Sequence, residues 1–155
     1  MTSAPDATRL RFEPSRVVLS TSASEIVLSV GAQSVADTLF RHDPPTGFEV
    51  EQAIDAVEDA LQASHLRQAD RGELVTDDPL MRSLPGLRHE GAQLSRDDIE
   101  ALFQRLASAA LGRPDALAGL AGGPQAAALL ILRECMHHLG FDSVRFVATD
   151  PTSAA

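Results

Sequence analysis

The segment Arg41–Thr46 (RHDPPT) combines residue types that bind anions and transfer protons. Arg41 carries a permanent positive charge, and His42 carries an imidazole that titrates near neutral pH. Thr46 lies at the expected start of a helix, where free backbone N–H groups attract anions. One interpretation is a phosphate or carboxylate site formed by Arg41, His42 and Thr46. A second is acid–base chemistry by His42 with Asp43 as its partner, and a third is a rigid capped connection that binds nothing.

A run of carboxylates follows on the same expected helix. Glu51, Asp55, Glu58 and Asp59 are spaced three or four residues apart or lie side by side. Like charges at these spacings cost a helix about 0.2–0.5 kcal/mol per pair. A partner that offsets this cost could be Arg67 or Arg71, a basic protein surface or, least favoured by a single helix face, a divalent cation. We expect these four residues to bind a partner protein with a basic surface, although a solvated acidic face would look the same.

The segment Cys135–His138 contains the third group of candidate side chains. Cys135 and His138 are three residues apart, a spacing at which two helical side chains can share Zn²⁺. Glu134 and His138 also form an i,i+4 pair. Cys135 continues an apolar stripe, which favours a core thiol, so we expect no metal, with His138 and His89 as the weak candidates. The residues that could supply a third ligand are His89, Glu90, His42 and His65.

The fourth group lies in residues 65–94. The sequence does not decide whether this stretch is a mobile flap or an irregular connection. Solvated loop charges are the simpler interpretation. The charged residues concerned are Asp77, Asp78, Arg82, Arg88, His89 and Glu90.

Motifs and composition exclude several functions. The sequence has no Walker motif, GxGxxG, GxSxG, HExxH or CxxC. All 13 basic residues are arginine, which excludes lysine chemistry, and 22 acidic residues give a net charge of −9, which argues against nucleic acid. The longest strongly apolar run, Ala126–Leu132, is too short to span a membrane. The N-terminus has no apolar leader and the only cysteine is Cys135, so we expect a cytoplasmic protein. Because the nucleotide and metal motifs are missing, we also expect no cofactor.

Periodicity predicts the elements that position these residues. Arg16–Ser20, Glu25–Val30 and Val35–Phe40 are expected strands of an antiparallel meander, with Leu10–Phe12 as a short edge strand. Helices are expected at about Gly47–Ala63, where Thr46 and Glu49 match a capping box, then after Ser95, and again from Pro124 to Gly140. Further strands are expected at Gly72–Thr76 and Ser143–Ala148.

This order predicts an α+β fold: a two-layer sandwich with an N-terminal antiparallel β-meander plus a C-terminal strand, packed by three helices. We expect one domain, residues 1–155, with an ordered core at 8–148 and flexible tails at 1–7 and 149–155.

Residues 43–64 hold six acidic residues and no arginine, so most of the excess negative charge is local. The leading hypothesis is an accessory or regulatory domain that binds a basic protein surface through this helix and can form a homodimer through its sheet. The alternative is an anion-binding protein or an enzyme that uses Arg41, His42 and Asp43.

Overall fold

A computed structural model describes residues 7–67, 71–117 and 123–148 of the chain. Of the expected flexible tails, only Ala7, which is exposed, falls within this part. The rest of both tails lies outside the described residues.

The structure contains a six-stranded mixed sheet with the strand order β3-β2-β1-β4-β6-β5. Strands β1, β2 and β3 form an antiparallel meander, and β5 is antiparallel to β6. β4 is parallel to both β1 and β6, so the centre of the sheet is parallel. The bounds are β1 (Thr8–Glu13), β2 (Arg16–Ser20), β3 (Glu25–Leu28), β4 (Gly72–Thr76), β5 (Gln93–Ser95) and β6 (Phe141–Phe146).

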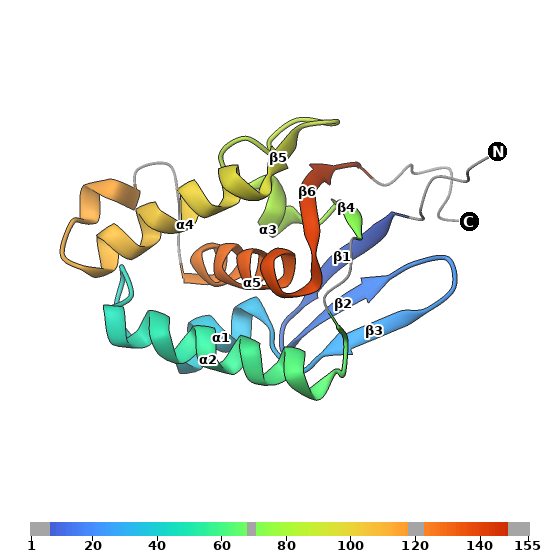
Figure 1. The fold of residues 1–155 in the computed structure, drawn as a ribbon. Coiled ribbons are helices and arrows are strands. Elements are labelled where there is room, and N and C mark those ends of the chain that lie inside the picture. Colours follow the sequence, from blue (N-terminus) through green and yellow to red (C-terminus); the bar gives the residue numbers. More distant parts are fainter. Residues whose placement is uncertain (1–6, 68–70, 118–122, 149–155) are drawn as a thin grey trace.

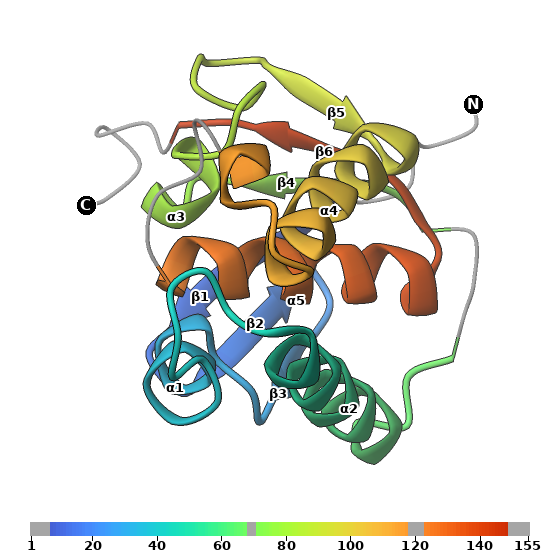
Figure 2. The ribbon, with the colours of Figure 1, turned by 90° about the vertical axis from the view of Figure 1, so that its left-hand side faces the viewer.

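The helices form a second layer on one face of this sheet (Figures 1 and 2). Parallel neighbours need long crossovers, and helices occupy the connections from β3 to β4 and from β4 to β6. None of the helices in the described ranges is both long enough and apolar enough to cross a bilayer. Their bounds are α1 (Ala32–Thr38), α2 (Gly47–Ala63), α3 (Pro79–Arg82), α4 (Arg96–Ala110), the 3₁₀ helix η1 (Pro114–Leu117) and α5 (Gly123–Leu139).

Helix α5 lies at the centre of the helical layer, with α4 on one side and α1 and α2 on the other (Figures 1 and 2). It is apolar around much of its circumference, because its neighbours cover it on several sides. Leu129, Leu130, Ile131 and Leu132 are consecutive, and all four are fully buried. Gly140 ends the helix with a φ of 89°, as expected for the residue after a helical C-terminus.

The α+β class, the meander, the three long helices and the C-terminal strand are confirmed. The expected strand at Val35–Phe40 is wrong, because most of this segment belongs to α1. Ala32 and Val35 bury one face of that helix, and the Ser34 side chain bonds to the backbone of Gly31. A segment this short fits both periodicities, and packing against α5 selects the helix.

Two further expectations about the sheet are corrected. The segment Leu10–Phe12 is not an edge strand, because β1 lies between β2 and β4 in the sheet. The sheet is mixed rather than largely antiparallel, and Leu74–Thr76 of β4 is buried without a break, as is typical of a central parallel strand.

Candidate functional site

The loop from α1 to α2 carries Arg41, His42 and Asp43 on the surface, followed by Pro44 and the buried Pro45. The Asp43–Pro44 peptide bond is cis. This loop leads directly into the N-terminus of α2.

Thr46 and Glu49 form the capping box that the sequence predicts. The Thr46 hydroxyl accepts a hydrogen bond from the Glu49 N–H at 3.2 Å, and the Glu49 carboxylate accepts one from the Thr46 N–H at 3.0 Å. The start of α2 is therefore fixed by side chains close to it in sequence.

The Glu49 carboxylate also binds the loop that precedes the helix. Its Oε2 atom accepts a hydrogen bond from the Arg41 N–H at 3.1 Å and lies 2.9 Å from His42 Nδ1. Burial alone would raise the pKa of Glu49, but the hydrogen bonds from His42, Thr46 and Arg41 outweigh it and lower the pKa to about 2. Glu49 is thus ionised at neutral pH.

An ionised carboxylate only accepts hydrogen bonds, so the hydrogen between Glu49 and His42 belongs to Nδ1 of the imidazole. The His42 side chain is 67% exposed, whereas that of Glu49 is only 7% exposed. In the neutral ring, Nε2 is then left as a proton acceptor. A buried carboxylate that orients an exposed imidazole in this way can support proton transfer at Nε2.

A cavity of about 360 Å³ lies beside this pair, between the end of α1 and the start of α2. Arg41, His42 and Thr46 line it together, as the anion-site interpretation requires. Gly47 and Phe48 begin α2, so their N–H groups have no partner within the helix. The other lining residues are Thr38, Leu39, Phe48, Glu49 and Gln52.

The structure changes one assignment in this loop. Asp43 is exposed and forms no hydrogen bond or ion pair with any residue in the described ranges, so it is not the partner of His42. Glu49 takes that role because the first turn of α2 brings its carboxylate back beneath the loop. The sequence identifies Glu49 only as a capping residue.

The carboxylates of α2 separate into two groups. Glu51, Asp55 and Asp59 are exposed, and none forms a hydrogen bond or ion pair with its side chain among the described residues. Glu58 instead faces α5, where its Oε1 atom lies 3.5 Å from His138 Nε2. Three of the four expected partner-binding residues therefore remain directed to solvent.

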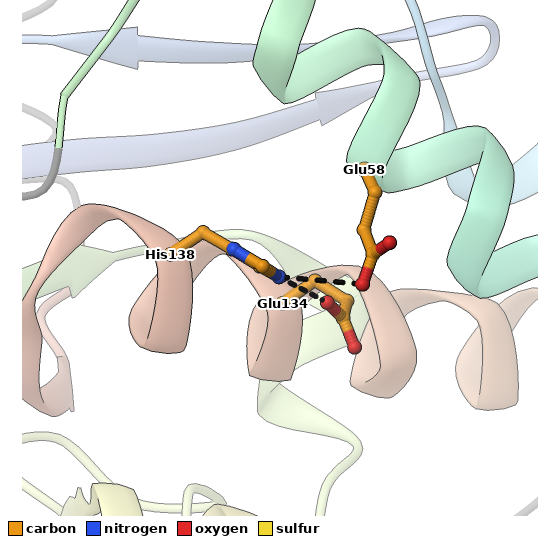
Figure 3. Close-up of side chains that lie close together, drawn as sticks. All are labelled: Glu58, Glu134 and His138. Carbon is orange, nitrogen blue, oxygen red and sulfur yellow. Dashed lines mark hydrogen bonds and ion pairs between the residues drawn. The ribbon is translucent and has the colours of Figure 1, made fainter.

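Figure 3 shows Glu58 of α2 together with Glu134 and His138 of α5. Glu134 is 2% exposed, and its Oε2 atom lies 2.9 Å from His138 Nε2. Its other oxygen accepts a hydrogen bond from Arg133 at 2.8 Å, and Arg133 also binds Glu100 of α4. Charged side chains therefore connect α2, α5 and α4.

Cys135 takes no part in this group. It is fully buried, and burial, with a contribution from the charge of Glu134, raises its pKa to about 12. The thiol is thus protonated, and its Sγ atom is not among the ligating atoms that meet at His138 in the described residues, despite the i,i+3 spacing. The core interpretation of Cys135 fits this position.

Most charged residues of the middle segment have structural partners. Asp78 caps α3 and also accepts a hydrogen bond from the Phe12 N–H at 2.8 Å. Asp77 lies 3.6 Å from Arg9, and Glu90 accepts a hydrogen bond from the Ala148 N–H. Met81, Leu84 and Leu87 are fully buried, so residues 79–87 form a packed connection and not an open flap.

The histidines do not converge on one site. His42 bonds Glu49 and His138 contacts Glu58, and these carboxylates are nine residues apart on α2, about 13 Å along the helix. Arg88 and His89 are exposed in the connection between α3 and β5. Of the two weak metal candidates, His138 lies beside Glu58 and Glu134, and His89 is not among the described residues whose ligating atoms meet there.

Comparison with known proteins identifies the fold. Neither protein-family models nor curated proteins match the sequence. Among solved structures, the Aquifex aeolicus PPX-GPPA enzyme superposes with a TM-score of 0.69 at 15% identity, covering 94% of this chain and 54% of that chain. The Aquifex aeolicus Ppx/GppA phosphatase, type II variant, gives the same values. An exopolyphosphatase from Cytophaga hutchinsonii gives a TM-score of 0.63 at 11% identity, covering 92% of this chain and 53% of that chain.

The chain thus has the fold of a part of these proteins and spans about half of their length. At 11–15% identity the likeness establishes the fold alone.

Proposed function

We propose that the cavity at the start of α2 binds a small ligand that carries a phosphate or carboxylate group. The observation that carries this proposal is the His42–Glu49 pair at 2.9 Å, with Arg41 lining the same cavity of about 360 Å³. This pair favours the anion-binding alternative from the sequence over the accessory-domain hypothesis. Glu49 takes the place that the sequence assigned to Asp43.

The charge of Glu49 does not exclude an anion. One carboxylate oxygen accepts from Thr46, and the other from Arg41 and His42, so the charge of Glu49 is stabilised by donors of the protein itself. An anion in the cavity would meet the Arg41 guanidinium, the imidazole of His42 and the N–H groups at the helix start. Two of the structural neighbours are named as a phosphatase and an exopolyphosphatase, which makes phosphate the first ligand class to test.

The cavity also has apolar lining. Leu39 and Phe48 contribute to it, and the Phe48 side chain is 69% exposed. An organic phosphate can contact these side chains as well as the polar groups. We therefore expect phenyl phosphate to bind more tightly than inorganic phosphate.

The test is calorimetric titration with inorganic phosphate, tripolyphosphate and phenyl phosphate. The double variant Arg41→Ala/His42→Ala is expected to weaken binding by about ten- to a hundred-fold, because it removes hydrogen bonds to a charged group. Release of phosphate from tripolyphosphate, followed in parallel, reports whether the His42–Glu49 pair also supports turnover.

The chain offers a matched control. Arg88 and His89 repeat the Arg–His dipeptide in an exposed connection. The variant Arg88→Ala/His89→Ala removes the same side chains and the same charge, and it is expected to bind as the wild type does. Equal affinities for the wild type and the Arg41/His42 variant would reject the proposal.

A second candidate function is partner binding by the acidic face of α2. The exposed positions of Glu51, Asp55 and Asp59 favour it, because no described residue neutralises them. Four expectations remain predictions: that the partner has a basic surface, that the chain forms a homodimer through its sheet, that it is a single domain, and that it is cytoplasmic.

A further inference from the structure

Three side chains with metal-ligating atoms meet where α2 crosses α5 (Figure 3). His138 Nε2 lies 2.9 Å from Glu134 Oε2 and 3.5 Å from Glu58 Oε1. One ligating atom from each of the three residues lies within 4.8 Å of the other two. Two helices supply these atoms, so they approach one point from different directions.

We infer that Glu58, Glu134 and His138 bind a divalent transition-metal ion, with Zn²⁺ as the best fit. Zinc accepts imidazole nitrogen and carboxylate oxygen at about 2.0–2.2 Å, so adjacent ligands of a tetrahedral ion are about 3.4 Å apart. The separations of 2.9 and 3.5 Å lie on either side of this value. Small rotations of the side chains would then admit the ion.

The backbone of α5 places two of the ligands side by side. Glu134 and His138 are four residues apart on α5 and so project from one face of the helix. Helical metal sites use the same i,i+4 spacing for ligand pairs. Glu58 adds the third ligand from α2, which a single helix could not supply.

The surrounding charge suits a divalent cation. Glu58, Glu134 and Glu100 contribute three negative charges, and Arg133 contributes one positive charge, which leaves −2. Arg133 binds the Glu134 oxygen that faces away from His138 and so directs the other oxygen at the imidazole. Supporting contacts of this kind orient ligands in known metal sites.

Water can complete the coordination from one side. A cavity of about 290 Å³ adjoins the cluster, and Glu58 and His138 help to line it. The side chains of His138 and Glu58 are 39% and 46% exposed, whereas that of Glu134 is 2% exposed. This arrangement leaves an open coordination position, as three-ligand zinc sites do.

An ion-pair network without metal uses the same residues but differs at one atom. In the ion pair, His138 Nε2 carries a hydrogen directed at the carboxylates. In the metal complex, Nε2 donates its lone pair to the ion. The ¹⁵N chemical shift of His138 Nε2 separates the two states.

The test titrates zinc chloride into untagged protein, freed of metal by chelation and dialysis, and follows binding by calorimetry and by ¹⁵N NMR of the imidazoles. We expect one equivalent of zinc to bind and to shift His138 Nε2. Glu58→Gln and His138→Asn are each expected to weaken binding at least tenfold, since loss of supporting contacts alone costs about ten- to a hundred-fold. Asp59→Asn changes the exposed residue next to Glu58, and His89→Asn removes an exposed imidazole from the connection between α3 and β5; both proteins are expected to bind as the wild type does.

Several results would overturn the inference: wild-type affinity weaker than about 1 mM, an unchanged His138 Nε2 resonance at saturation, or equal binding by the Glu58→Gln protein. Glu58 is partly exposed, so its variant decides the question even where His138→Asn fails to fold. The Arg41→Ala/His42→Ala protein should bind zinc normally, so this inference and the proposed anion site can fail separately.

Discussion

Glu49 connects the start of α2 to the loop before it. Its carboxylate accepts hydrogen bonds from two backbone N–H groups and from His42, all within 3.1 Å. These donors favour the ionised form, which is why the pKa falls to about 2 although the side chain is buried. A single carboxylate therefore both caps the helix and orients the imidazole.

This depressed pKa predicts how stability depends on acid. The folded pKa of about 2 lies below the ordinary value of 4.5, so the ionised carboxylate stabilises the folded state. That contribution is complete above about pH 4.5 and declines as the pH falls toward 2. Glu49→Gln should therefore lower the free energy of unfolding at pH 7, with a deficit that shrinks between pH 4.5 and pH 2 in urea denaturation curves.

Glu51→Gln is the control, because Glu51 is exposed on the same helix and its carboxylate accepts no hydrogen bond from the described residues. Its curve is expected to follow that of the wild type. A Glu49→Gln deficit that stays constant down to pH 2 would show that the hydrogen bonds do not favour the ionised form.

At the scale of elements, α1 is held against the β1–β2 turn by close backbone packing. The Ser34 N–H donates to the Pro14 carbonyl at 2.9 Å. A Cβ atom added at Gly31 would lie 2.4 Å from that same carbonyl oxygen and 2.6 Å from the Arg16 nitrogen. Both atoms belong to the backbone, so neither can move aside by a side-chain rotation.

Gly31→Ala is therefore expected to destabilise the protein by about 1–3 kcal/mol, the usual cost of overpacking. Gly47→Ala is the matched control, since a Cβ atom there would meet only Leu111 at 4.0 Å. Replacing that glycine is expected to be neutral or to stabilise by up to about 1 kcal/mol, because alanine restricts the unfolded chain. Urea denaturation measures both, and equal effects would contradict the packing argument.

The sequence predicts the elements that local signals define. Thr46 and Ser95 begin the helices that they cap, and Gly140 ends the last helix as expected. The parallel pairing of β4 with β1 and β6 could not be predicted, because it joins segments more than 60 residues apart. Val35 could not be assigned correctly either, since the decisive contacts come from α5.

The candidate sites follow the same division. The i,i+4 pair of Glu134 and His138 and the capping role of Glu49 are visible in the sequence. The contact of Glu58 with His138 depends on how α2 packs against α5. The contact of Glu49 with His42 depends on how the loop before α2 folds back over the helix. Local spacing thus identifies single ligands, whereas the partners come from tertiary structure.

At the scale of the whole molecule, α2 and the loop before it stand out because residues 43–64 hold six acidic residues and no arginine. Glu51, Asp55 and Asp59 leave solvent-exposed charge along α2 that a basic partner can neutralise. Such attraction is screened over about 10 Å at 0.1 M salt. Partner binding by this surface should therefore weaken as ionic strength rises.

A deca-arginine peptide tests this surface. The variant Glu51→Gln/Asp55→Asn/Asp59→Asn is expected to bind it at least about threefold more weakly than the wild type at low salt, with a smaller salt dependence, by fluorescence anisotropy. Glu25→Gln/Asp97→Asn/Asp142→Asn removes the same charge from exposed positions on other elements. Equal losses in both variants would show that net charge, and not the α2 surface, attracts the peptide.

The central position of α5 has a consequence for synthesis of the protein. Helices α1, α2, α3 and α4 all pack against α5, yet the ribosome makes residues 123–139 after all four of them. Until α5 emerges, Val35, Val57 and Leu106 have no complete core to enter and stay open to chaperones and proteases. Folding of this chain therefore waits for α5, and a chain that stalls on the ribosome before residue 123 has an incomplete core.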